Sequence, residues 1–283
     1  MAEKVTVRDV ARMKGSKRIV MITAYDYPTA KIVDSAGVDI ILVGDSLAMV
    51  VLGYPTTHGA TLRDMLRHTA AVARAKPRAL VVGDMPFGSY EPSSSKAIKS
   101  AIAFVKAGAE AVKLEGGSEY ADRVKAIARA GIPVMGHIGL TPQRHLTLGG
   151  YRPRGRRVEE ARQLLLDAEA LQEAGAFSIV IEFTASEVAE LITRRLEIPT
   201  ICIGSGPKCD GQVLVLHDIL GLSEHTPPFA KKYVDLRQII YEAVSNYVRE
   251  VREGLFPGPE HTVVKLKEPL DLESLLREVE GGG

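Results

Sequence analysis

The chain has 283 residues, of which 46% are hydrophobic, and a formal net charge of +1 from 36 basic and 35 acidic side chains. This length suits one large domain, such as an α/β barrel of about 250 residues. The balanced charge argues against nucleic acid or a polybasic membrane contact. The amino terminus lacks the apolar core of a signal peptide, and no apolar run approaches the ~20 residues of a membrane span. We therefore expect a soluble, cytoplasmic protein.

Apolar runs typical of buried strands alternate along the chain with amphipathic runs typical of helices. A short helix is expected near 6–14, and a long helix near 233–253 is followed by a polar tail. Ser93 and Gly108 suit the two caps of one helix. The predicted strands are 18–26, 38–46, 79–84, 111–115, 132–139, 177–182, 198–206 and 213–218, and the other predicted helices are 28–37, 61–76, 93–108, 120–131, 158–175 and 185–196.

Eight apolar strands separated by helices, with no change of composition that marks a linker, predict a single (β/α)8 TIM barrel over residues 1–283. Continuously apolar strands are what a parallel sheet buried on both faces requires. The longest insertion between a strand and its helix, 140–156, has the features of a functional lid. Its basic run, 151–157, is interpreted as a solvated loop, with a contact to an anionic ligand as the alternative.

Six of the apolar runs end in an ionisable side chain. In such barrels the active site lies at the carboxyl ends of the strands, so these side chains should converge on one mouth. A single acid after a strand often caps a helix or forms a turn, and the role of the last of the six stays undecided. The six residues are Asp45, Asp84, Glu115, His137, Glu182 and Asp218.

Asp45, Asp84 and Glu115 together predict a metal site, because three facing carboxylates repel one another unless a cation lies among them. Oxygen ligands favour Mg²⁺, with Mn²⁺, Co²⁺ or Zn²⁺ as alternatives. Such an ion can bind the carboxylate and keto oxygens of a 2-oxo acid and lower the pKa of the adjacent C–H. Glu182 is then placed to act as the base, if burial raises its pKa.

Three further residues have candidate roles at this mouth. Lys113 shares a strand face with Glu115 and is expected to stabilise negative charge on the substrate, with a Schiff base or a plain ion pair as alternatives. His137 is a candidate donor to a substrate oxygen or a support for a ligand, or else a structural histidine. Ser46 offers a hydroxyl and a backbone N–H to a bound carboxylate.

The chain has two cysteines, Cys202 and Cys209. Half of a metal site is one interpretation, but neither a second pair nor a neighbouring histidine accompanies them. We therefore expect reduced cytosolic thiols, one of them inside a strand.

A set of long, ordered phrases resembles the ketopantoate hydroxymethyltransferase family from residue 6 to about 262. The phrases are ITAYD (22–26), LVGDS (42–46), LGYPTT (52–57), VGDMPFGSY (82–90), VKLEGG (112–117), MGHIGLTPQ (135–143), IVIE (179–182), ICIGSG (201–206), CDGQVLVLHDILG (209–221) and PPFAKKY (227–233).

This resemblance implies a barrel of the phosphoenolpyruvate/pyruvate superfamily type. It also implies Mg²⁺-dependent transfer of a one-carbon unit from 5,10-methylenetetrahydrofolate to 3-methyl-2-oxobutanoate. The product is 2-dehydropantoate, on the route to pantothenate, and the reaction passes through a metal-stabilised enolate. A homo-oligomer, commonly a decamer, is also implied.

The family's functional residues fall on positions of this sequence. Its metal ligands fall on Asp45, Asp84 and Glu115, and its proton acceptor falls on Glu182. Its substrate contacts fall on Asp45, Ser46, Asp84 and Lys113.

Two alternatives stay open at this point. One is a metal-dependent C–C lyase of the related superfamily acting on a 2-oxo acid, although such lyases tend to carry a KKCGH-like loop that is missing here. The other is a non-catalytic barrel, which would have no reason to keep a base, metal ligands and a lysine together.

Overall fold

The computed structural model describes residues 3–281. The chain divides into two compact units, Met1–Val234 and Asp235–Gly283, and each is described by itself.

The first unit is a closed barrel of eight parallel strands in chain order, with β1 paired to both β2 and β8. This architecture confirms the predicted (β/α)8 barrel. The strands are β1 (Ile19–Thr23), β2 (Ile40–Val43), β3 (Leu80–Asp84), β4 (Ala111–Lys113), β5 (Val134–Gly139), β6 (Ser178–Glu182), β7 (Thr200–Ile203) and β8 (Gly211–Leu214).

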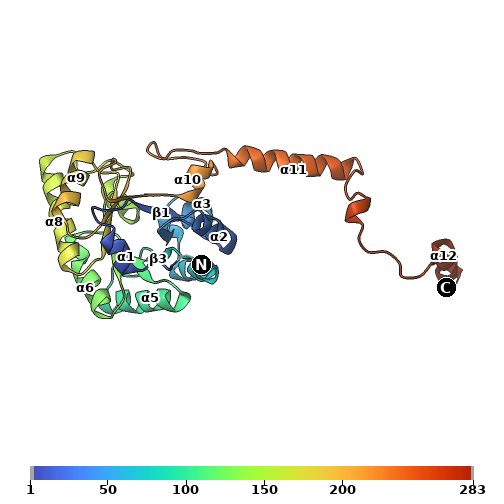
Figure 1. Ribbon diagram of the computed structural model, residues 1–283, viewed down its shortest axis with the longest axis horizontal. Coiled ribbons are helices and arrows are strands. Elements are labelled where there is room, and N and C mark those ends of the chain that lie inside the picture. The colour runs from blue at the N-terminus through green and yellow to red at the C-terminus, as the bar shows by residue number, and fades with distance from the viewer. Residues whose placement is uncertain (1–2, 282–283) are drawn as a thin grey trace. The chain divides into compact units, whose positions relative to one another are not determined.

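Helices surround this barrel (Figure 1). Helix α5 begins after Ser93, whose side chain accepts a hydrogen bond from the N–H of Lys96, and it ends at Gly108 in the left-handed region, as predicted. The helices that follow the strands are α2 (Tyr27–Ser35), α3 (Leu47–Val50), α4 (Leu62–Arg74), α5 (Ser94–Ala107), α6 (Ala121–Arg129), α7 (His145–Leu148), α8 (Val158–Glu173), α9 (Ser186–Arg195) and α10 (Leu216–Leu220). Single turns of 3₁₀ helix are η1 (Thr57–Gly59), η2 (Ser118–Tyr120) and η3 (Pro142–Arg144).

Alternate residues of each strand belong to two different cores. Ala111 of β4 and Met135 of β5 lie in a cluster with residues of the other strands, which fills the barrel interior. Val10 of the amino-terminal helix α1 (Val7–Arg12) belongs to the same cluster. Val112 and Val134, one residue away, pack in the larger cluster with the surrounding helices. Because strand side chains alternate, Lys113 and His137 continue the interior rows of β4 and β5.

The connection between β7 and β8 contains no helix, and none was predicted between residues 206 and 213. Residues 204–210 join two parallel neighbours, a connection that normally needs a dozen or more residues. The backbone returns to the start of β8 so directly that the Cα atoms of Cys202 and Cys209 lie 5.7 Å apart, and the two residues form a disulfide. The prediction of two reduced thiols is therefore wrong.

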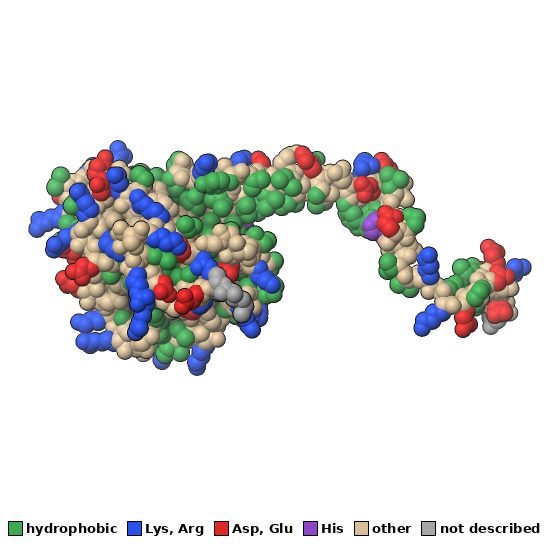
Figure 2. Space-filling model, in the orientation of Figure 1, with side chains coloured by type: hydrophobic (Ala, Val, Ile, Leu, Met, Phe, Trp, Pro, Cys, Tyr) green, Lys and Arg blue, Asp and Glu red, His purple; other side chains and the backbone are tan. Residues whose placement is uncertain are grey.

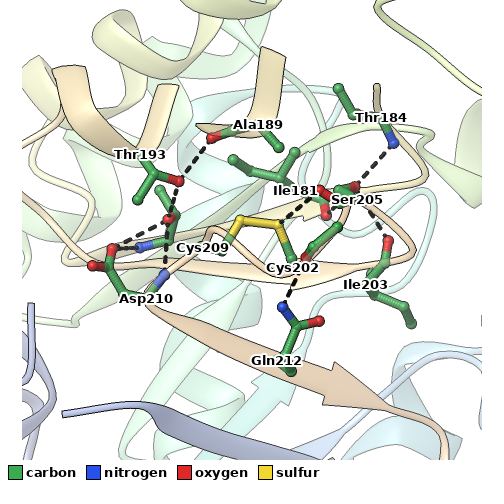
Figure 3. The surroundings of a disulfide bond; sticks show 12 residues. Ile181, Thr184, Ala189, Thr193, Cys202, Ile203, Ser205, Cys209, Asp210 and Gln212 are labelled. Atoms are coloured by element: carbon green, nitrogen blue, oxygen red, sulfur yellow. Dashed lines mark hydrogen bonds between the residues drawn. A yellow bond between two sulfur atoms is a disulfide. The ribbon is translucent and has the colours of Figure 1, made fainter. Parts of the chain in front are cut away.

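Hydrogen bonds support this short connection on both sides of the disulfide (Figure 3). The carboxylate of Asp210 accepts from the backbone N–H of Thr200, and the Ser205 hydroxyl donates to the carbonyl of Ile181. The two cysteines themselves are fully buried. The connection is thus tied to both β6 and β7.

The second unit contains α11 (Leu236–Arg252), η4 (Pro259–His261) and α12 (Leu272–Gly281). Figure 2 shows hydrophobic side chains along one side of α11, and none of the residues of this helix is buried. Within residues 3–281, no helix has the length and hydropathy needed to cross a membrane.

Candidate active site

All the residues predicted for the site line one cavity of about 570 Å³ at the carboxyl ends of the strands. Asp84, Lys113 and Glu182 end β3, β4 and β6, and His137 lies in β5. Residues of loops also line the cavity, among them Tyr151 and Pro153 of the insertion 140–156. The exposed side chains of Arg152, Arg156 and Arg157 are consistent with a solvated loop.

Lys113 lies in a cage of carboxylates. Its register partner on β3 is Asp84, and its Nζ donates to Asp84 Oδ1 at 2.7 Å and lies 3.9 Å from Glu115 Oε1. Burial by itself lowers the pKa of Lys113, but the charges of Asp84, Glu115 and Asp45 outweigh it and hold the pKa above its ordinary value. The buried ammonium therefore stays charged, which disfavours the Schiff-base alternative, since that role needs a neutral amine.

Asp45 follows β2 and is held from two sides. Its backbone N–H donates to Asp84 Oδ2 at 3.1 Å, and its own Oδ2 accepts from Gln143 Nε2 at 2.9 Å. Gln143 also donates its backbone N–H to Glu115 Oε2 at 3.0 Å and accepts from the hydroxyl of Tyr90 at 2.7 Å. Gln143 thus joins two of the predicted metal ligands, Asp45 through its side-chain amide and Glu115 through its backbone N–H.

Sequence reasoning missed the roles of Gln143 and Tyr90. Both lie inside the phrases that carry the family resemblance, so their positions were visible. Nothing in their spacing showed that they would meet, because the two residues are 53 positions apart.

His137 lies between two carboxylates. Its Nδ1 is 3.4 Å from Glu115 Oε1, and its Nε2 is 3.2 Å from Glu182 Oε2. Burial and Lys113 lower the pKa of His137, but Glu115 and Glu182 raise it to about 9, so the imidazolium is the stable form. The side chain of Glu182 is 16% exposed and reaches the cavity. These distances place His137 beside the predicted base, although the geometry of neither contact is that of a hydrogen bond.

Ser46 lies directly after Asp45, and its Oγ is 2.9 Å from the hydroxyl of the buried Tyr25. Asp218 differs from the prediction, because β8 ends at Leu214 and Asp218 lies in the short helix α10. Its carboxylate nevertheless lines the cavity, where Oδ1 accepts from Ser223 Oγ at 2.5 Å. Burial raises the pKa of Asp218.

The three predicted metal ligands fit a hard divalent cation in their donor type, because all are carboxylates. Their charge also suits a cation. Burial, and to a lesser extent the negative charges of Asp84 and Glu115, raises the pKa of Asp45 well above its ordinary value. A bound cation would offset the repulsion among these carboxylates. As the side chains stand, Glu115 contacts His137 and Gln143. Among residues 3–281, no group of three or more His, Cys, Asp or Glu side chains is arranged to hold a metal ion.

The chain was then compared with known proteins. The model of the family described as ketopantoate hydroxymethyltransferase matches residues 4–259. The chain belongs to this family. It is therefore an enzyme of the transferase class, a hydroxymethyltransferase, as the resemblance implied.

Individual members of the ketopantoate hydroxymethyltransferase family agree closely with the chain. It is 70% identical to the 3-methyl-2-oxobutanoate hydroxymethyltransferase of Aeropyrum pernix over 95% of the chain and 98% of the relative. It is 61% identical to the protein of the same name from Hyperthermus butylicus over 99% of the chain and 98% of the relative. These relatives support neither the lyase nor the non-catalytic alternative.

The fold of the chain is similar to that of several solved barrels. A phosphonopyruvate hydrolase in complex with oxalate and Mg²⁺ superposes with a TM-score of 0.61 at 14% identity, covering 98% of the chain and 99% of the hydrolase. A 2,3-dimethylmalate lyase of the PEP mutase/isocitrate lyase superfamily gives 0.58 at 17% identity, covering 98% and 95%. At such identities the similarity is one of fold, and it agrees with the closed (β/α)8 barrel of this chain.

Proposed function

We propose that the chain transfers a hydroxymethyl unit from 5,10-methylenetetrahydrofolate to 3-methyl-2-oxobutanoate and so forms 2-dehydropantoate for pantothenate biosynthesis. The observation that carries the proposal is that the predicted metal ligands, the base and the lysine line one cavity, in a chain that belongs to this family. The residues are Asp45, Asp84, Lys113, Glu115, His137 and Glu182. The reaction balances with one water, which supplies the hydroxyl group, and it releases tetrahydrofolate.

Asp45, Asp84 and Glu115 would hold the divalent cation, and their all-oxygen donor set favours Mg²⁺ over softer ions. The ion would act as a Lewis acid that polarises the keto group and makes the neighbouring C–H more acidic. Gln143 supports this group by fixing one oxygen of Asp45 and one of Glu115.

Glu182 is the proposed base for the C3 proton of the oxo acid. Its carboxylate lines the cavity and lies beside His137, which in turn lies beside Glu115. After the proton moves to Glu182, the enolate carbon forms the new bond to the one-carbon unit of the donor. Both carbon–nitrogen bonds of that unit break, the oxygen of one water becomes its hydroxyl group, and the two folate nitrogens receive one proton from the water and one from Glu182. His137 is thus a positioning residue for the base.

Lys113 and Ser46 are the proposed contacts for the negative oxygens of the substrate. The Lys113 ammonium is already oriented by Asp84, so little reorganisation is needed when negative charge develops nearby. Ser46 is oriented by the hydroxyl of Tyr25.

Exchange of the C3 proton of 3-methyl-2-oxobutanoate in D₂O with Mg²⁺ and without folate, followed by NMR, tests the first chemical step. We expect exchange in the wild type and a loss of at least about a hundredfold in Glu182→Gln, because a positioned base contributes about 10²–10⁴-fold. Glu187→Gln is the matched control, since Glu187 is an exposed residue of α9.

Absence of exchange in the wild type, even with tetrahydrofolate added, would overturn the enolate mechanism. Equal exchange in Glu182→Gln and wild type would instead assign the base to another residue. Adding a chelator to the wild type, and then an excess of Mg²⁺, tests the requirement for the metal in the same assay.

We further propose that the enzyme acts in the cytoplasm as a homo-oligomer, commonly a decamer in the family it resembles. Hydrophobic residues exposed on α11 support self-association: Ile240, Val244, Tyr247 and Val251 recur at the spacing of one helix face.

A further inference from the structure

The lining of the cavity is not uniform along the chain. The predicted metal-binding and catalytic side chains come from the ends of β2 to β6, with Leu42, Met49, Val50, Leu140, Pro142, Pro153 and Val180 beside them. From Phe183 onward the lining is mainly hydrophobic, apart from Asp218, His225 and Thr226, and its hydrophobic residues are Phe183, Ile203, Val213, Leu214, Val215, Pro227, Pro228 and Phe229. A five-carbon oxo acid bound through its carboxylate and keto oxygens is too small to cover so large an apolar surface. Cavities of about 300–1,000 Å³ are typical of drug-sized ligands, and this one measures about 570 Å³.

Two aromatic rings form a wall in this mainly hydrophobic part of the lining. Phe183 and Phe229 pack with ring centroids 5.3 Å apart and planes inclined by 55°. Both rings line the cavity, and Phe183 directly follows the proposed base, Glu182. The pair therefore borders the place where the proposed new carbon–carbon bond forms.

The backbone is adapted to present these two rings. Phe183 has a φ of +43°, a conformation that costs of order 1–3 kcal/mol for a residue other than glycine. It is held there by hydrogen bonds of 2.8 Å from its N–H to Ile203 and from the N–H of Arg154 to its carbonyl. At Gly204 an added Cβ would lie 2.5 Å from the ring of Phe229, so only glycine leaves room for that ring.

We propose that Phe183 and Phe229 form the stacking wall for the fused, 2-amino-4-oxo pteridine ring of the one-carbon donor, and that Asp218 binds the polar edge of this ring. The inference rests on the proposed function, in which a folate is the donor. A ring stacked beside Phe183 has its reactive carbon next to Glu182, where the oxo acid loses its proton.

Asp218 has the chemistry that this polar edge requires. The edge carries an amino group and a ring N–H side by side, two donors that match the two oxygens of a carboxylate. Asp218 is 5% exposed, lines the cavity and has no role in the proposed chemistry of the oxo acid. Its Oδ1 accepts one hydrogen bond from Ser223, which orients the group and leaves further acceptor positions.

A second aromatic group near the mouth provides the alternative wall. Phe87 stacks on His58 with centroids 4.4 Å apart, and His145 stacks on Tyr151 at 5.9 Å. Of these four residues only Tyr151 lines the cavity. Phe87 is half exposed, which makes Phe87→Leu a matched control for the loss of a ring.

The test is calorimetric binding of 5-formyltetrahydrofolate, a stable folate, to the full chain with Mg²⁺ present. We expect Phe183→Leu and Phe229→Leu each to raise the Kd about tenfold, in the range seen when a stacking ring is removed. Asp218→Asn should raise it by a similar factor, because the amide presents one acceptor where the carboxylate presents two. Phe229→Tyr keeps the ring and should retain binding within about threefold. Thermal unfolding of each variant shows whether it is folded.

Four results separate the inference from the proposed function. Wild-type Kd values in folded Phe183→Leu and Phe229→Leu would overturn the stacking wall, and a comparable loss in Phe87→Leu would move the ring to the other aromatic group. Absence of C3 proton exchange in the wild type, even with tetrahydrofolate added, would overturn the proposed function itself, whatever the binding data show. Exchange in a wild type that does not bind the folate would overturn the folate donor and, with it, the stacking wall.

Discussion

Gln143 has a larger part in the site than its residue type suggests. Its side chain donates to Asp45 and to the carbonyl of Met85, and it accepts from Tyr90. All these partners are buried, so removing the amide would leave several polar groups without hydrogen bonds. At the residue scale, the geometry of the carboxylates depends on an uncharged neighbour.

Gln143→Leu is therefore expected to lower the free energy of unfolding by about 2–4 kcal/mol, because each buried group that loses its partner costs about 1–3 kcal/mol. It should also weaken Mg²⁺ binding, measured by calorimetry, because Asp45 loses the donor that orients it. Gln163→Leu is the control, since Gln163 makes one exposed hydrogen bond to Asp167 on α8. Unchanged stability and unchanged Mg²⁺ affinity in Gln143→Leu would contradict this assignment.

Lys113 gives a second prediction at this scale. Because Asp84 and Glu115 hold its ammonium as a charged partner, we expect no covalent adduct when borohydride is added with 3-methyl-2-oxobutanoate. Lys113→Met should reduce kcat about 10²–10³-fold, as the loss of a preorganised electrostatic group does in other enzymes. Mass spectrometry of the intact chain checks the first point, and a mass increase at Lys113 would restore the Schiff-base role.

At the scale of elements, the short connection between β7 and β8 is the main departure from a regular barrel. It has no helix to pack against the sheet, and it is held by the Cys202–Cys209 disulfide and by Asp210. The same connection contains Gly204, and the ring of Phe229 packs against this glycine. The stability of this segment thus affects one wall of the cavity.

Reduction of the disulfide is expected to lower the free energy of unfolding by about 2–3 kcal/mol, the value for closing a short loop in the unfolded chain. The measurement is denaturant unfolding with and without a phosphine reductant. The double variant Cys202→Ala/Cys209→Ala is the control and should show no response to the reductant. Equal stability of the wild type in both conditions would argue against a stabilising disulfide.

At the scale of the whole molecule, the unit that begins at Asp235 contains α11, whose hydrophobic face is not covered by any other part of that unit. Isolated hydrophobic residues on a surface are normal, but a continuous stripe at helical spacing indicates a contact with another protein surface. We propose that this surface belongs to another copy of this chain, as in the proposed homo-oligomer, rather than to the barrel of the same chain.

Light scattering coupled to size exclusion tests this assignment. The wild type is expected to have the mass of an oligomer, and Val244→Lys, in the middle of the stripe, should reduce that mass. Asn246→Lys adds the same charge elsewhere on α11 and should leave the mass unchanged. A monomeric wild type, or an unchanged mass in Val244→Lys, would exclude α11 as the interface.

The sequence by itself determined the order and kind of the barrel strands, because buried parallel strands need continuous apolar runs and such runs are local. It also determined which side chains meet at the mouth, because parallel strands in a closed barrel all end at the same rim. The alternation of side chains along a strand placed Lys113 on the same row as Glu115 before any contact was known.

The tertiary structure alone decided which of these groups touch and what holds them. The contacts of Asp45 with Gln143, the disulfide between Cys202 and Cys209, and the position of Asp218 in α10 all depend on loop paths. Loop paths are fixed by packing and hydrogen bonds between residues far apart in the chain, and neither periodicity nor spacing in the sequence encodes those distances. For the same reason the ring pair of Phe183 and Phe229, 46 positions apart by their numbers, became visible only in the folded chain.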